Sequence, residues 1–315
     1  MRSIALIFTL FLFVSCAKTT DEKVAEAIDV ANSYLSKGKC QSAIDTLEDV
    51  GRQGSNGVYL QVLASAYACR AGFSELTFLL TDLDVMTQSN DILTNLSIIS
   101  TSPEDETDSD SYLDLQTAIN LLIDSTAAAP SQSARNTKFG TRRAGDMGTQ
   151  ALLMMFAQLG KFLHYYGDVN PTTGVKGGGS GSNNCFIAYT DNTAIGLLSG
   201  TCNSTGTRTG HIDLSLSSGL SATKSKLCEG LMLVTNIIDT INNIQIPQDS
   251  TLSALDSVKT EINSMKTAIY TGGLETLLDT TDQTTCTTLV APTDNSGEFE
   301  NLQRIYASLF EGGLP

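Results

Sequence analysis

Apolar residues recur every three or four positions along most of this chain, which is the spacing of one face of an α-helix. Over residues 22–85 the pattern breaks at Gly38 and again at Gly72-Phe73, so it predicts two pairs of short helices. The residues expected on their inward faces are Val24, Ala27, Ala31 and Tyr34, then Ala43, Leu47 and Val50, then Leu60, Ala64 and Tyr67, then Leu76, Leu79 and Leu83.

The same spacing continues through the rest of the chain. It is strongest over residues 146–166, which we expect to form the central helix of the second half. Two further stripes, over 227–241 and 252–269, predict an antiparallel helical hairpin. Other short helices are predicted from Ile92, Leu96 and Ile99, from Tyr112, Leu115, Ile119 and Leu122, and from Phe299, Leu302, Tyr306 and Leu309.

Residues 167–224 depart from the helical spacing. Their glycine-rich stretch, 177–182, lacks the Gly-Lys-Ser/Thr that would follow in a phosphate-binding loop, so it predicts a flexible linker. Alternation at Cys185, Ile187 and Tyr189, and at Ile212, Leu214 and Leu216, predicts short strands, with Cys185 and Cys202 bracketing a small disulfide-tied hairpin. Loops of this kind often carry binding functions.

These patterns together predict a mainly α protein. A helical region is expected over 22–126, a polar loop over 127–145, and a helical bundle over 146–315 with a disulfide-tied irregular or β insertion at about 167–224. The polar loop gathers the basic side chains of Arg135, Lys138, Arg142 and Arg143. We expect them at the surface, either as ordinary loop charges or in contact with lipid headgroups or an acidic partner.

The N-terminal residues predict where the protein is sent. Arg2 is followed by an apolar run over residues 4–12 that is too short to be a permanent membrane span, and then by Phe13-Val14-Ser15-Cys16. These four residues resemble the lipobox of bacterial lipoproteins. The resemblance implies a signal peptide over 1–15, lipid on Cys16, and a tether over 16–21. Because no Asp follows the cysteine, it implies attachment to the outer membrane, with the body on the periplasmic face or, in some bacteria, on the outside. An ordinary secretory signal is the alternative.

The first helices also carry a repeat. Tyr34 and Tyr67, and likewise Ala43 and Leu76, are separated by 33 residues. The pattern Ala31-x-x-Tyr34-x-x-x-Gly38-x-x-x-x-Ala43, repeated loosely as Ala64-x-x-Tyr67 with Gly72, resembles a degenerate pair of tetratricopeptide repeats within 22–85. Two generic helical hairpins are the alternative. The resemblance implies a concave groove for a peptide or partner helix, lined by Tyr34 and Tyr67 unless these are packing residues.

The chain has seven cysteines. With Cys16 lipidated, the other six can form three disulfides in an oxidising compartment, and fifteen connectivities are possible. The repeat resemblance implies that Cys40 begins one helix and Cys69 lies near the end of an antiparallel neighbour. We therefore favour sequential pairing, which is Cys40–Cys69, Cys185–Cys202 and Cys228–Cys286. No CxxC or HxxxH spacing is present, so zinc is not expected.

Composition and candidate chemistry exclude several classes of function. The net charge is −15, and loss of residues 1–15 leaves 18 basic and 34 acidic residues, so nucleic acid is not an expected partner. The acidic loop 103–110 and the pair Asp168 and Asn170 resemble calcium loops only in part, because the later acidic ligand is missing. His164 has no nearby Ser or Cys partner, and His211 and Asp213, which would share one face of a strand, are too few ligands to make a metal site alone. We expect no cofactor, metal or catalytic constellation.

The sequence therefore favours a membrane-anchored envelope lipoprotein that acts as a non-catalytic scaffold or adaptor for a protein or peptide partner. One alternative is a solute-binding accessory, similar to the helical-repeat lipoproteins associated with TRAP-type transporters. A small apolar cavity between the first hairpins and the 152–166 helix would favour that alternative. An enzyme, the third reading, would require His164 or His211 to meet an acid across the fold.

Overall fold

The computed structural model describes residues 19–87, 92–101, 107–123, 131–179, 183–198, 200, 202–204, 210–212, 220–244, 255–270, 274–290 and 297–311. The lipobox and Cys16 lie outside these residues. The described chain is mainly helical, as the sequence predicts. Its helices are α2 (Thr20–Leu35), α3 (Cys40–Glu48), α4 (Gly57–Arg70), α5 (Glu75–Thr77), α6 (Leu83–Thr87), α7 (Ile92–Ile98), α8 (Asp110–Ile123), α9 (Gln132–Phe139), α10 (Thr141–Gly167), α11 (Asn192–Leu197), α12 (Leu220–Asn243), α13 (Leu255–Tyr270), α14 (Glu275–Leu278), α15 (Gln283–Leu289) and α16 (Glu298–Tyr306).

The first helices begin and end at residues with clear capping roles. The Thr19 hydroxyl accepts the Glu22 backbone N–H, and the Glu22 carboxylate accepts the Thr19 N–H, which together form a capping box for α2. Gly38, with a φ of 67°, allows the turn into α3. Asn56 caps α4 by accepting the backbone N–H groups of Val58 and Tyr59.

The segment after α4 differs from the expectation. A π-helical turn, η2 (Phe78–Asp82), separates α5 from α6. Leu76, predicted to face inward, is 66% exposed, whereas Phe78 is fully buried. The π turn adds residues to one turn of helix and so changes which positions face the core.

The polar loop predicted over 127–145 is wrong where the structure describes it, because α9 and the start of α10 lie there. The Ser131 hydroxyl caps α9 by accepting the Ala134 N–H. Arg135, expected at the surface, is 1% exposed. Its guanidinium donates to Gln132 Oε1 and to the Ile123 carbonyl, so this charged side chain belongs to the core.

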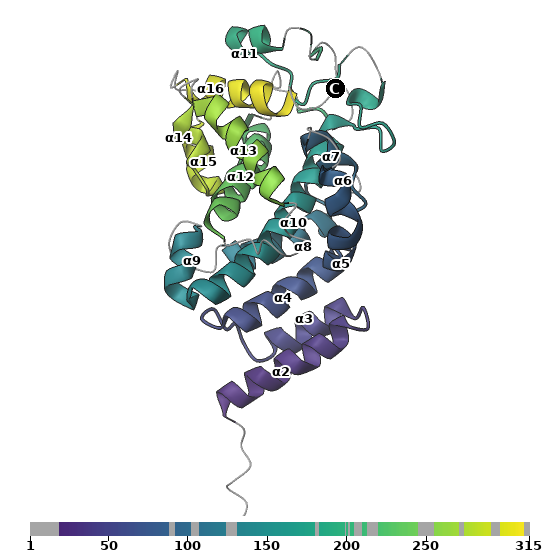
Figure 1. Cartoon of the computed structure of the whole chain (residues 1–315), viewed down its shortest axis with the longest axis vertical. Coiled ribbons are helices and arrows are strands. Elements are labelled where there is room, and N and C mark those ends of the chain that lie inside the picture. The colour runs from purple at the N-terminus through teal and green to yellow at the C-terminus, as the bar shows by residue number, and fades with distance from the viewer. Residues whose placement is uncertain are drawn as a thin grey trace, which may run out of the picture.

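Helix α10 is the central element of the fold. It packs against α4, α7, α8, α9 and α12, and nearly all of its residues from Met147 to Gly167 are buried. Figure 1 shows α10 running through the middle of the molecule, with α2 and α3 at one end and the C-terminal helices near the other. The prediction of a central helix over 146–166 is confirmed, with its start at Thr141.

The insertion between α10 and α12 contains little β structure in its described part. One parallel bridge joins Ile187 to Ile212, and α11 lies between Cys185 and Cys202, so the predicted strands and hairpin are wrong there. Leu214 and Leu216 lie outside the described residues. The backbone N–H groups of Thr190 and Asp191 donate to Gln303 Oε1 on α16, so a side chain takes the place of a strand neighbour.

A buried ion pair fixes the insertion to the C-terminal π-helical turn η5 (Ala307–Glu311). Lys176 Nζ lies 2.7 Å from Glu311 Oε2, and both side chains are 0% exposed. The other carboxylate oxygen of Glu311 accepts the Phe186 N–H and the Tyr189 hydroxyl, each at 2.7 Å. Gly177–Gly179, part of the predicted linker, form a 3-10 turn beside Lys176. Residues 180–182 lie outside the described chain.

Candidate functional site

The three disulfides are the pairs that the sequence analysis favours. Cys40 at the first residue of α3 is bonded to Cys69 near the end of α4. The other pairs are Cys185–Cys202 and Cys228–Cys286. Cys286 lies within α15. The last bridge joins α12 to α15, which pack against each other although α13 and α14 lie between them in the chain.

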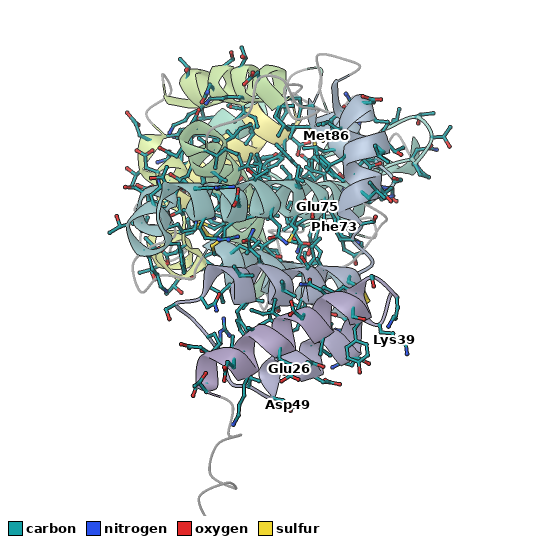
Figure 2. All side chains as sticks on the ribbon, turned by 60° about the horizontal axis from the view of Figure 1, so that its bottom comes forward. Glu26, Lys39, Asp49, Phe73, Glu75 and Met86 are labelled. Atoms are coloured by element: carbon teal, nitrogen blue, oxygen red, sulfur yellow. A yellow bond between two sulfur atoms is a disulfide. The ribbon has the colours of Figure 1, made fainter. Side chains whose placement is uncertain are left out.

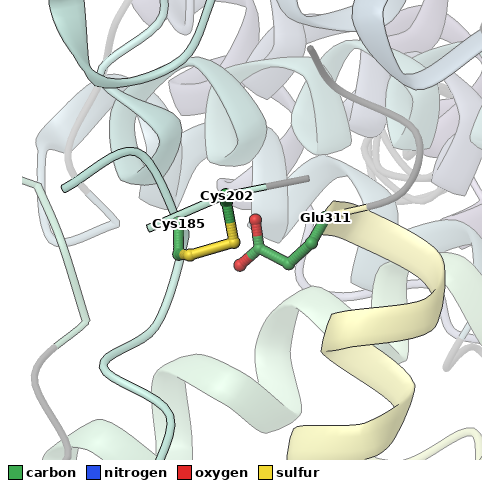
Figure 3. Close-up of side chains that lie close together, drawn as sticks. All are labelled: Cys185, Cys202 and Glu311. Atoms are coloured by element: carbon green, nitrogen blue, oxygen red, sulfur yellow. A yellow bond between two sulfur atoms is a disulfide. The ribbon is translucent and has the colours of Figure 1, made fainter. Parts of the chain in front are cut away.

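Figure 3 shows the Glu311 carboxylate beside the Cys185–Cys202 disulfide. The potential ligand atoms of these three residues lie within 4.8 Å of one another. Both sulfurs are bonded to each other and therefore offer no thiolate, and Glu311 already binds Lys176, Phe186 and Tyr189. This cluster is a structural joint of the insertion.

Tyr34 and Tyr67 are both partly buried and pack against the core. The Tyr67 hydroxyl donates to Glu48 Oε1 at 2.8 Å, and burial together with this bond raises the Tyr67 pKa to about 12. Arg70 lies over the Tyr67 ring and forms a bidentate pair with Asp114 on α8. Neither tyrosine lines either of the two hollows described below.

The other residues singled out from the sequence have structural contacts. His164 is buried, and its Nδ1 lies 2.7 Å from the Ser97 carbonyl oxygen, to which it donates. Asn170 Oδ1 accepts the backbone N–H groups of Thr172 and Thr173, so it closes a turn. His211 lies in the insertion beside the bridge residue Ile212, while Asp213 and residues 102–106 of the acidic loop are outside the described chain.

A groove of about 820 Å³ lies between α4 and α10, and we call it the α4–α10 groove. The C-terminal residues of α12 close one side of it, and Glu75 lies at its edge. Figure 2 shows Glu75 next to Phe73, between α4 and the segment that carries Met86. The lining residues are Val58, Gln61, Val62, Ser65, Glu75, Gln132, Asn136, Thr141, Arg142, Gly145, Asp146, Thr149, Gln150, Asn243 and Ile244.

The floor of this groove contains an unsatisfied acceptor. Gln150 Nε2 donates to the Gln61 backbone carbonyl and to the Ser65 hydroxyl, which fixes the orientation of the amide. Gln150 Oε1 is buried and has no hydrogen-bond partner. Leaving such a buried acceptor without a hydrogen bond costs about 1–3 kcal/mol. The groove floor is therefore polar, and one of its hydrogen-bond acceptors is unsatisfied.

The groove also carries charge and open space. Glu75 and Asp146 bring negative charge to its lining, and Arg142 brings positive charge. Burial raises the pKa of the Glu75 carboxyl. A Cβ atom at Gly145 would meet nothing within 4 Å. The groove therefore has room for a polar chain of some length.

A second hollow of about 420 Å³ lies between α8, α10, α12 and α15, and we call it the Glu229 pocket. Its floor is apolar and its rim is polar. The lining residues are Thr107, Leu113, Gln116, Ile119, Asn120, Ile123, Met155, Ser225, Glu229, Met232, Leu233, Asn236, Thr281, Asp282, Gln283 and Thr284.

Glu229 is the chemically unusual residue of this pocket. Burial raises its pKa to about 7, although the Tyr112 hydroxyl and the Lys226 charge act in the opposite direction. Tyr112 is fully buried, and its hydroxyl has no partner in full hydrogen-bonding geometry, so its interaction with Glu229 is electrostatic. A carboxyl that titrates near neutral pH in a hollow is a frequent mark of a binding or catalytic site.

Sequence reasoning missed Glu229. It lies between Cys228 and Gly230 in the apolar stripe of α12, where an acidic residue beside a glycine is only a weak signal. Gly230 is required there, because a Cβ atom would lie 2.4 Å from the Tyr306 hydroxyl oxygen and 2.5 Å from Phe162 Cζ. This close approach places Phe162 of α10 and Tyr306 of α16 against α12 at the residue next to Glu229.

Comparison with known proteins adds no functional assignment. No protein-family model, curated protein or solved structure matches this chain. Among the residues that the structure describes, no helix combines the length and the apolar character that crossing a membrane requires.

Proposed function

We propose that this chain is a lipid-anchored envelope lipoprotein that acts as a non-catalytic scaffold and binds a peptide or protein partner in the α4–α10 groove. The lipobox residues Phe13-Val14-Ser15-Cys16 support the anchor on the outer membrane, with the body in the periplasm. The three disulfides agree with an oxidising compartment. The repeat resemblance of residues 22–85 remains a prediction.

The open, polar α4–α10 groove carries the proposal. A peptide has a backbone donor and acceptor at nearly every residue, so it suits a groove whose walls present amides, hydroxyls and both signs of charge. Val58, which is 37% exposed, offers an apolar contact at the edge. A backbone N–H entering beside Gln150 would relieve its unsatisfied Oε1 once neighbouring side chains rotate aside.

The solute-binding alternative called for a small apolar cavity between the first hairpins and the 152–166 helix, and the hollow found there is the open α4–α10 groove, which polar and charged side chains line. The apolar hollow between α7, α10, α12 and α13 has a volume of about 20 Å³. That is room for about one water molecule, which is too little for an organic solute. The apolar space between these four helices is therefore essentially filled.

Site-specific photo-crosslinking in intact cells tests the proposal. A photoreactive amino acid replaces Val58 in the groove or, as a matched control, Val30 on α2, which is 39% exposed against 37% for Val58. We expect a discrete envelope-protein adduct from position 58 and none from position 30. Equal adducts at both positions would contradict a specific groove.

A blocking variant completes the test. Gly145→Phe places a ring in the groove without a clash at Cβ, while Gly196→Phe on α11 is equally unobstructed and lies outside the groove. We expect the first substitution to abolish the adduct from position 58 and the second to preserve it. Survival of the adduct in Gly145→Phe would refute binding in the groove.

A further inference from the structure

The Glu229 pocket has the composition of a site for a small organic cation. Two carboxyl residues, Glu229 and Asp282, line it, and none of its lining residues is a lysine, arginine or histidine. Met155, Ile119 and Ile123 at its floor are almost fully buried and apolar. A ligand that fits must therefore carry positive charge at one end and an apolar body at the other.

The polar groups around the pocket restrict the ligand further. The side-chain amide nitrogens of Gln116, Asn236 and Gln283 already donate to protein acceptors. The carboxyl of Glu229 forms no ion pair within the described chain, because Lys226 lies over the Tyr166 ring instead. One oxygen of Asp282 accepts the Thr285 N–H, and the other is available. The groups left to contact a ligand are mainly acceptors, which call for a ligand with donors.

The pocket is also accessible and partly preformed. Leu113, Asn120, Ser225 and Thr284 at its rim are exposed, and Glu229 is only partly buried, so a ligand can reach the carboxyl. The volume of about 420 Å³ falls in the range of small-molecule sites. A bare metal ion suits it less well, since no three ligating side chains of the described chain converge there.

We propose that the Glu229 pocket binds a small primary or secondary amine in its ammonium form, with Glu229 as the counter-ion and the apolar floor around the hydrocarbon part. The buried Tyr112 hydroxyl, which faces Glu229 and has no other partner, then completes the solvation of the ionised carboxylate. This inference is independent of the α4–α10 groove and goes beyond the proposed scaffold function.

Charged neighbours set the pH dependence of binding. Glu229 faces Tyr112 on α8, Tyr306 on α16 and Lys226 on its own helix, and Asp282 lines the same pocket. An ammonium beside Glu229 favours the ionised carboxylate, so binding near pH 7 releases a proton from the carboxyl. Affinity for the amine is expected to rise between pH 5 and pH 8.

Isothermal titration calorimetry with hexylammonium chloride tests the inference on the full-length mature protein. We expect saturable binding with a dissociation constant of about 1 mM, which suits a ligand of this size, and no binding of sodium hexanoate or hexanol. Glu229→Gln should weaken binding about tenfold or more, and Glu75→Gln, in the other groove, should leave it unchanged. Titrations in two buffers of different ionisation heat should show proton release in wild type and none in Glu229→Gln.

A second variant guards against an indirect effect of Glu229→Gln. Asn120→Lys adds positive charge at the exposed rim, and it should weaken hexylammonium binding without disturbing the core. The inference would be overturned if hexylammonium showed no saturable binding, or if hexanoate or hexanol bound equally well. It would also be overturned if Glu229→Gln bound hexylammonium undiminished, or if Glu75→Gln lost binding.

Discussion

The Glu229 carboxyl should make the stability of this protein depend on pH in an unusual direction. Its pKa is raised from an ordinary 4.5 to about 7. Below pH 4.5 the carboxyl is protonated in both the folded and the unfolded chain and contributes no difference. Between pH 4.5 and about pH 7 the Glu229 carboxyl ionises in the unfolded chain but keeps its proton in the folded chain, so the free energy of unfolding falls as the pH rises.

The size of this effect follows from the shift. At about 1.4 kcal/mol per pH unit, a pKa that moves from 4.5 to about 7 corresponds to about 3 kcal/mol. Other groups titrate in the same range, so the quantity to measure is the difference between wild type and Glu229→Gln in urea unfolding followed by circular dichroism. We expect the advantage of Glu229→Gln to grow by about 3 kcal/mol between pH 4 and pH 8 and then to level off.

Two further variants test the cause of the shift. Tyr112 and Lys226 both lower the Glu229 pKa, so Tyr112→Phe and Lys226→Met should each move the midpoint of this transition to higher pH. A difference between wild type and Glu229→Gln that stays constant with pH would refute the reasoning, as would midpoints that move to lower pH in both variants.

The remaining predictions concern stability and anchoring. Lys176→Met should lower the free energy of unfolding by about 3–5 kcal/mol in urea, because it leaves a buried carboxylate without its cation; a loss under about 1 kcal/mol would contradict the pairing. Gly230→Ala should cost about 1–3 kcal/mol by overpacking, measured the same way, and a neutral effect would mean that the neighbouring rings move freely. Replacing both Cys40 and Cys69 by serine should cost about 3 to 4 kcal/mol, since the bridge closes a separation of 29 residues, and an unchanged denaturation midpoint would argue against it. Cys16→Ser should move the protein from the membrane to the soluble fraction of lysed cells, and mass spectrometry of the wild-type N-terminal peptide should detect acylated Cys16; membrane retention of the variant would rule out the lipid anchor.

Local periodicity predicted the helices well because their apolar faces are encoded within a few turns of chain. Helix α10 is the clearest case, since apolar residues recur at helical spacing from Leu152 to Tyr166, and nearly all residues from Met147 to Gly167 are buried. Its approximate end was predictable as well, because the sequence leaves helical spacing near Gly167. The Cys40–Cys69 bridge was inferred from the repeat resemblance, which implies antiparallel packing of the two helices that carry these cysteines.

Buried polar residues were much harder to predict. Lys176 and Glu311 are 135 residues apart, and neither one's local sequence indicates that it is buried. Arg135 was assigned to the surface for the same reason, although Gln132 and the Ile123 carbonyl satisfy it in the core. Such residues are buried only because a distant partner offsets the cost of removing them from water, and that partner is absent from any local pattern. Glu229 was missed for a similar reason, because the buried Tyr112 beside it lies far away in the sequence, on α8.

The two hollows share helices α10 and α12, which raises the question of whether they communicate. Coupling would require a second arrangement of these helices that both ligands could favour. The packing leaves little room for one: a Cβ atom at Gly148 would lie 2.5 Å from Gln132 Oε1, and one at Gly230 would lie 2.4 Å from the Tyr306 hydroxyl oxygen. Sliding either helix would drive its backbone into these neighbours. The α4–α10 groove and the Glu229 pocket should therefore act independently, so hexylammonium should leave the crosslinks from position 58 unchanged.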